Sequence, residues 1–165
     1  MFNSSSWNNT RIIDLTLDSV VGMNDDIMAR VLDLVAPSHG TLTRLALDRN
    51  KLTRVPDQVS RLPKMTYFSM YGNPVGGLAN GSLTFAGHLT YLGLQNSTLT
   101  SVAADAFSGN FSGTYVGLQS NLLSRLPSDV YADVLQSMTA DNGYFAFGGS
   151  KNINQSINQS INLNN

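Results

Sequence analysis

The sequence contains no cysteine and only 2 histidines, His39 and His88. Without cysteine, the chain cannot form a disulfide scaffold, a thiolate nucleophile or a cysteine–zinc site. Charged side chains make up only 13% of the sequence, which is about half the usual share. The 10 basic residues and 11 acidic residues give a net charge of −1. Because there is no basic surplus to neutralise phosphates, we expect no nucleic-acid partner.

Long apolar runs are missing too. No uninterrupted stretch approaches the ~18 residues of a membrane span. The first residues also lack the charged and apolar regions of a signal peptide. We therefore expect no membrane insertion by this segment. Hydrophobic residues nevertheless make up 42% of the 165 residues, which is enough to form the core of one domain.

The sequence shows no arrangement that is typical of catalysis or metal binding. Residues Gly143–Ser150 have the glycine spacing of a phosphate-binding loop, but glycine stands at the position of the required lysine. His39 and His88 are far apart and have no further metal ligands nearby, and no spacing of serine, histidine and aspartate suggests a triad. We therefore predict that the protein is not an enzyme and has no catalytic residue, cofactor or metal site.

A repeat of the form L-x-x-L-x-L-x-x-N-x-L runs along the chain. Its copies share mostly apolar residues at the L positions and usually an asparagine at the N position. The four clearest copies are Leu42, Leu45, Leu47, Asn50 and Leu52; Met65, Phe68, Met70, Asn73 and Val75; Leu89, Leu92, Leu94, Ser97 and Leu99; and Gly113, Val116, Leu118, Asn121 and Leu123. Weaker copies begin at Ile12 and at Leu135, the latter with Met138 and Ala140.

This pattern and its period resemble the leucine-rich repeat family over about residues 12–147. The junction from Trp7 to Leu17 resembles the start of the extracellular repeat domain in leucine-rich repeat receptors and receptor-like kinases. The resemblance implies an α/β solenoid, with short parallel strands on the concave face and irregular or short helical segments on the convex face. It also implies a protein- or peptide-binding role.

The pattern divides the chain into three parts. Residues 1–11 form an N-terminal flank, and residues 12–147 form the repeat domain of about six repeats. Residues 148–165 contain the recurring unit Ile-Asn-Gln-Ser. Such a tail buries too little apolar surface to offset its chain entropy, so we expect it to be disordered.

Each repeat position predicts a structural role. The L-x-L pair alternates with period two, as a short strand with one buried face should. The side-chain amides of Asn50, Asn73 and Asn121 can satisfy backbone groups that the turning chain leaves unpaired. We therefore predict a structural asparagine ladder, in which Ser97 supplies only part of the bonding.

The first repeat is longer than the others and contains a helical segment. Apolar residues recur at helical spacing over residues 25–35, Asn24 or Asp25 can cap the start, and Pro37 ends the helix. The predicted core-facing stripe consists of Ile27, Val31 and Leu34, with Met28, Leu32 and Val35 beside them. We predict a convex-side helix that covers the end of the stack.

Tyr67, Tyr91 and Tyr115 occupy the same position in three successive repeats, one residue before a buried strand residue. Strand alternation points all three away from the core. The predicted partner-binding surface also contains Arg44, Asp48, Ser69, Tyr71, Gln95 and Gln119. Tyrosine is enriched in binding hot spots. Cross-strand aromatic packing that only stabilises the sheet is the alternative, and both roles can coexist.

Sequons for N-glycosylation are frequent in the sequence. Three fall in predicted exposed turns of the repeat region, at Asn80, Asn96 and Asn110. Others begin at Asn3, Asn8, Asn154 and Asn158. They favour an extracellular protein or a receptor ectodomain, whereas the missing signal peptide leaves a cytoplasmic location open.

Three functions fit these observations. The first is a non-catalytic module that binds a protein or peptide on the concave surface. The second is a truncated ectodomain of a leucine-rich repeat receptor-like kinase, whose membrane span and kinase domain are absent from this chain. The third is a cytosolic leucine-rich repeat adaptor.

Overall fold

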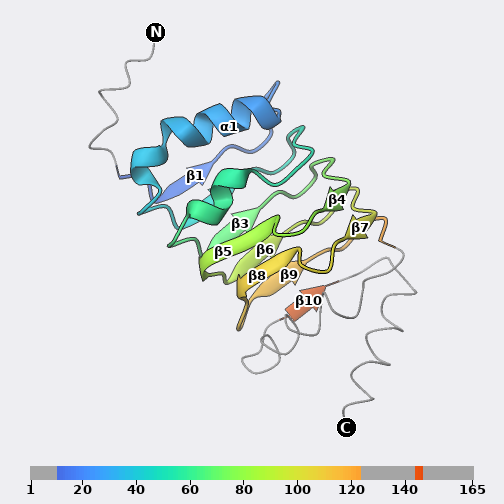
Figure 1. Ribbon diagram of the computed structural model, residues 1–165. Helices are drawn as coiled ribbons and strands as arrows, with labels where there is room; N and C mark the ends of the chain where they lie inside the picture. The colour runs from blue at the N-terminus through green and yellow to red at the C-terminus, as the bar shows by residue number, and fades with distance from the viewer. Residues whose placement is uncertain (1–10, 124–143, 147–165) are drawn as a thin grey trace.

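The computed structural model describes residues 11–123 and 144–146, which form a parallel β-solenoid (Figure 1). Short strands recur once per coil and stack side by side into a six-stranded parallel sheet in the order β1-β2-β3-β6-β9-β10. The strands are β1 (Asp14–Thr16), β2 (Arg44–Ala46), β3 (Tyr67–Ser69), β6 (Tyr91–Gly93), β9 (Tyr115–Gly117) and β10 (Tyr144–Ala146).

The last strand of the sheet corrects the predicted repeat register. Tyr144, Phe145 and Ala146 pair with Tyr115, Val116 and Gly117, whereas the pattern placed the last strand around Met138. The predicted copy that begins at Leu135 lies outside the described residues. Strands β3, β6 and β9 share the order tyrosine, apolar residue, small residue, and Tyr144–Ala146 has the same order. This local motif predicts the strand better than the leucine spacing does.

The rest of each coil differs between the two halves of the solenoid. Early coils contain the helix α1 (Asp25–Leu34) and the short 3₁₀ helices η2 (Ala36–Ser38) and η3 (Asp57–Arg61). Later coils instead contain strands, which form two parallel pairs: β4 (Gly77–Leu78) with β7 (Ser101–Val102), and β5 (Leu83–His88) with β8 (Phe107–Asn110). The prediction of irregular or helical segments opposite the sheet is therefore correct only for the early coils.

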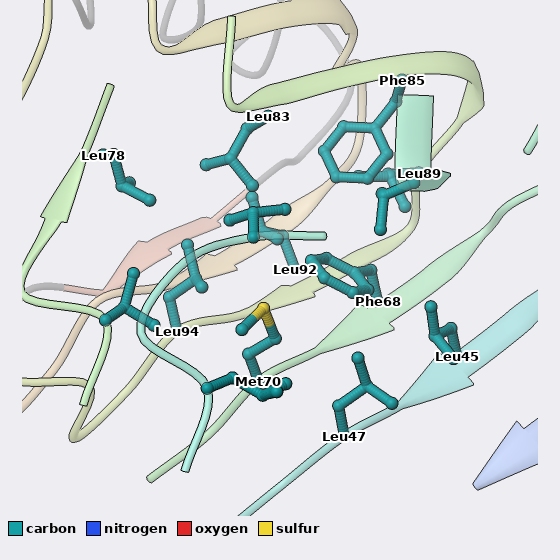
Figure 2. Packing of buried hydrophobic residues seen from close by; sticks show 14 of the residues in the cluster. Leu45, Leu47, Phe68, Met70, Leu78, Leu83, Phe85, Leu89, Leu92 and Leu94 are labelled. Carbon is teal, nitrogen blue, oxygen red and sulfur yellow. The ribbon is translucent and has the colours of Figure 1, made fainter. Parts of the chain in front are cut away.

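The core lies between the six-stranded sheet and these outer segments (Figure 2). Leu45, Phe68 and Leu92 point inward from successive strands and are fully buried. The ring of Phe85, on β5, packs against Phe68 with 5.9 Å between centroids. Each such buried side chain contributes about 1.5–3 kcal/mol, so the stacked coils stabilise one another through one continuous core.

Helix α1 follows the first strand along the chain (Figure 1), contacts η2 and η3, and begins where the Asn24 side chain accepts a hydrogen bond from the Ile27 amide at 3.0 Å. The predicted helix is present, but its predicted core-facing stripe is partly wrong. Met28 and Leu32 are fully buried, whereas Ile27 is 40% and Leu34 61% exposed. Met28 and Leu32 are four residues apart and form one ridge. The helix packs on the core through this narrow ridge, with Val31 and Val35 partly buried beside it.

The three asparagines of the ladder bond between coils in the same way. The Nδ2 of the buried Asn73 donates to the carbonyls of Met70 and, in the preceding coil, Leu47, each at 2.9 Å. Its Oδ1 accepts from the Leu52 amide at 3.1 Å. Asn50 and Asn121 repeat this arrangement. The Ser97 hydroxyl donates to the Met70 carbonyl at 3.2 Å, whereas the Val75 amide of the preceding coil donates to the Asn73 carbonyl at 2.9 Å instead.

Two further columns run along the solenoid that the leucine pattern does not include. One is a threonine column, whose hydroxyls donate to backbone carbonyls of the preceding coil: Thr43, Thr66, Thr90 and Thr114. The other is a column of residues with left-handed backbone, φ between +53° and +71°: Ser19, Arg49, Gly72, Asn96 and Ser120. These residues turn the chain out of the first five strands of the sheet.

Candidate functional site

The outward-facing side chains at the start of the sheet strands form a row across the solenoid. Arg44, Tyr67, Tyr91 and Tyr115 are paired in register on β2, β3, β6 and β9. All four are half-buried, while the next residue on each strand is fully buried. We call these four residues the tyrosine row, and the sheet surface that carries them the tyrosine face.

The side chains of the tyrosine row are stacked face to face. The ring centroids of Tyr67 and Tyr91 are 4.5 Å apart with 6° between planes, and those of Tyr91 and Tyr115 are 5.2 Å apart with 11° between planes. The Arg44 guanidinium lies 3.6 Å from the Tyr67 centroid. These distances match the ~4.8 Å spacing of neighbouring strands, so the strand register itself imposes the stacking.

Two glycines create the space in which the rings lie along the sheet. A Cβ on Gly93 would be 2.8 Å from Cε1 of Tyr91, and a Cβ on Gly117 would be 3.0 Å from Cε1 of Tyr115. The Gly117 position is also covered by the Gln95 amide, whose Nε2 would lie 2.3 Å from the added Cβ. One edge of each ring therefore faces the sheet, and the opposite edge faces outward.

Glutamines hold the phenol groups in place. Gln95 donates from Nε2 to the Tyr91 hydroxyl at 3.2 Å, and Gln119 donates to the Tyr115 hydroxyl at 2.7 Å. Each glutamine follows its tyrosine by four residues, beyond the end of the same strand. The Oε1 atoms of both glutamines are buried without a hydrogen-bond partner. The two amides thus restrain the Tyr91 and Tyr115 rings through these hydrogen bonds.

Charged groups gather at the β1 and β2 end of the tyrosine face. Arg44 forms an ion pair with Asp14 at 3.4 Å. The Asp48 carboxylate accepts hydrogen bonds from the Ser69 hydroxyl at 2.5 Å and the Tyr71 amide at 2.9 Å. Burial is the main cause that raises the pKa of Asp48 above its ordinary value of 3.8. This end of the face is polar, whereas the centre is aromatic.

Tyr91, at the centre of the row, has a perturbed phenol. Burial between its neighbours raises the pKa of Tyr91 above 10.0, and the hydrogen bond from Gln95 opposes this shift. Tyr91 therefore remains a neutral hydroxyl well beyond physiological pH.

The structure brings the nine predicted partner-binding residues onto one face, in adjacent columns of the sheet. Arg44 and the three stacked tyrosines form the first column, and Asp48, Tyr71, Gln95 and Gln119 follow the strands on the same side. Ser69 lies between the columns but is buried, 1% exposed, and its hydroxyl bonds to Asp48. A partner cannot reach Ser69, whose place in the surface is structural. The binding role of the others stays a prediction.

The repeat pattern did not align Tyr144 with the tyrosine positions of the earlier strands. Tyr144 is paired with Tyr115 in the register of β9 and β10, so the tyrosine positions continue onto the last strand. The signal was the order tyrosine, apolar residue, small residue, which Tyr144–Ala146 shares with the three earlier strands.

The three sequon asparagines of the repeat region are exposed. Asn80 lies in a turn, and Asn96 belongs to the left-handed column. Asn110 is the last residue of β8 rather than part of a turn, and its Oδ1 accepts from the Ser112 amide at 2.9 Å. All three amide side chains are open to solvent, which is what attachment of a glycan requires.

Within residues 11–123 and 144–146, no group of three or more histidine, cysteine or acidic side chains is arranged to hold a metal ion. No helix in the described part of the chain has the length and apolar character that crossing a membrane requires. A scan of protein-family models, a search of curated proteins and a search of solved structures each found no match to this chain.

Proposed function

We propose that this protein is a non-catalytic recognition module of the leucine-rich repeat type, which binds a protein or peptide on the tyrosine face. Three features support the repeat type. The apolar repeat positions are buried, the asparagines bond between coils, and successive repeats each contribute one strand to a parallel sheet. In this fold type the tyrosine face is the concave surface.

The observation that carries the proposal is the stacked row itself. Tyrosines offer large and rigid contact area at little conformational entropy, together with a hydrogen-bonding tip. Three rings on neighbouring strands form an aromatic strip about 10 Å long, since parallel strands lie about 4.8 Å apart. Stacking and the glutamine bonds hold the strip in place before a partner arrives, which lowers the entropic cost of binding.

The substitution Tyr91→Ser tests the proposal. It removes the centre of the strip, where hot spots concentrate, and should weaken partner binding by about 2 kcal/mol or more. Stability should fall less, because the substitution loses cross-strand contacts of about 0.2–1 kcal/mol each. The measurement is the Kd, by calorimetry, of a peptide selected on the wild-type protein from a displayed library, together with the Tm of both proteins.

Leu34→Ser is the matched control, since Leu34 is an exposed apolar residue on helix α1, away from the six-stranded sheet. It should change neither the Kd nor, beyond about 0.5 kcal/mol, the stability. If Tyr91→Ser lowers the Tm while the Kd stays unchanged, the row only stabilises the sheet, and the partner binds elsewhere.

A truncated ectodomain of a receptor-like kinase is the more specific candidate, and the exposed sequons favour it. Expression behind an added secretion signal should attach glycans at Asn80, Asn96 or Asn110, which glycopeptide mass spectrometry detects. Secreted protein with all three asparagines unmodified would favour the cytosolic adaptor instead.

A further inference from the structure

The ring faces of Tyr67 and Tyr91 are not open to a partner. Tyr91 is covered on both sides by Tyr67 and Tyr115, at 4.5 Å and 5.2 Å. The second face of Tyr67 is covered by the Arg44 guanidinium at 3.6 Å. These separations are close to the ~3.5–4.0 Å at which carbon atoms are in van der Waals contact, so no ligand group can enter between the stacked side chains.

This covering excludes several classes of ligand. Quaternary ammonium groups and lysine side chains bind aromatic cages through the electron-rich face of the ring. Flat sugars also stack on aromatic faces, and nucleobases stack in the same way. None of these ligands has an open face at Tyr67 or Tyr91, so neither a cation nor a sugar can bind through the faces of these two rings.

The accessible part of the row is the outer ring edge. Gly93 and Gly117 receive the opposite edge, which carries Cε1 of Tyr91 and of Tyr115. Ring edges carry the positive part of the aromatic quadrupole, and they pair with the negative face of another ring in T-shaped contacts. The Tyr91 oxygen accepts from Gln95, and this bond does not use the hydroxyl hydrogen, which can donate to another acceptor.

We propose that the tyrosine face binds an extended peptide through an aromatic side chain that lies flat across the outer edges of Tyr67, Tyr91 and Tyr115. A flat ring matches a flat strip about 10 Å long, and its negative face matches the positive edges. A backbone carbonyl of the peptide, next to that aromatic side chain, accepts a hydrogen bond from the Tyr91 hydroxyl. This inference rests on the proposed function and adds the chemistry of the partner.

The test begins with an unbiased library of displayed 12-residue peptides, selected on the wild-type protein and counter-selected on Tyr91→Ser. The selected peptides should be enriched in Phe, Tyr or Trp. Replacing that aromatic residue by Leu keeps an apolar side chain but removes the π face, and should weaken binding about two- to tenfold. In NMR spectra, edge protons of Tyr67 and Tyr91 should move upfield, because they lie beneath the partner's ring. Cellohexaose and tetramethylammonium should leave these resonances unchanged.

The outcomes separate this inference from the proposed function. Peptides that depend on Tyr91 but tolerate the Leu replacement would overturn the aromatic partner and leave peptide binding intact. Shifts of the tyrosine resonances with cellohexaose or tetramethylammonium would overturn the exclusion of face-binding ligands. If no selected peptide depends on Tyr91, the proposed function itself fails.

Discussion

The substitution Asn73→Ala tests how the asparagine ladder holds neighbouring coils together. In the wild-type protein, the Oδ1 of Asn73 accepts a hydrogen bond from the Leu52 amide. The Nδ2 of Asn73 donates hydrogen bonds to the Leu47 and Met70 carbonyls. Both carbonyls keep another donor after the substitution, namely Asn50 for Leu47 and Ser97 for Met70. The main loss is therefore the partner of one buried amide.

The unpaired Leu52 amide determines most of the expected loss of stability. A buried N–H without a partner costs about 1–3 kcal/mol, and the weaker bonding of the two carbonyls adds to this cost. We expect Asn73→Ala to lower the free energy of unfolding by about 2–3 kcal/mol. Urea unfolding followed by circular dichroism measures this change, with the slope of the transition checked for constancy.

Two comparisons make the test specific. Asn50→Ala should lower the free energy of unfolding by less than Asn73→Ala does. The Oδ1 of Asn50 accepts a hydrogen bond from the amide of Val20, which is 38% exposed, so water can replace that bond. The exposed Asn80 offers a control, since Asn80→Ala should stay within about 0.5 kcal/mol of wild type. An equal loss at Asn73 and Asn80 would refute the reasoning, and so would a larger loss at Asn50 than at Asn73.

Two further predictions concern the backbone and the charged end of the tyrosine face. Ser120 has a φ of +58°, so Ser120→Gly should relieve left-handed backbone strain of about 1–2 kcal/mol. The entropic cost of the added glycine is about 0.4–1 kcal/mol, so we expect a net stabilisation. A lower Tm than wild type would contradict this expectation. Because the pKa of Asp48 is raised on folding, its contribution to stability is fully present below about pH 3.8 and is lost as the pH rises through the folded pKa. Asp48→Asn lacks this titration, so its stability relative to wild type should be higher at pH 7 than at pH 3.5 in urea unfolding, and no difference between the two pH values would contradict the raised pKa.

Much of the solenoid could be predicted from the spacing of residues alone. Leu45, Phe68 and Leu92 recur at fixed offsets, and such offsets place side chains on one face of a strand whatever surrounds it. Asn73 and its equivalents were also predictable as structural, since a turning chain must satisfy its backbone groups. The helix followed from local capping and periodicity, which act within a few residues.

Other features were decided only by contacts between coils. Leucine spacing placed the last strand around Met138, whereas pairing with Val116 on β9 places it at Tyr144–Ala146. The face of helix α1 that is buried depends on its single ridge against the core, which left Leu34 exposed.

The tyrosine row shows the same division. Its period follows from the sequence, because one residue recurs in each repeat. The closure of the ring faces of Tyr67 and Tyr91 does not follow from the sequence, because it depends on the strand spacing, on the guanidinium of Arg44 and on the absent side chains of Gly93 and Gly117. A repeat determines which residues become neighbours, whereas the packed distance between coils determines which surface of each residue remains for a partner.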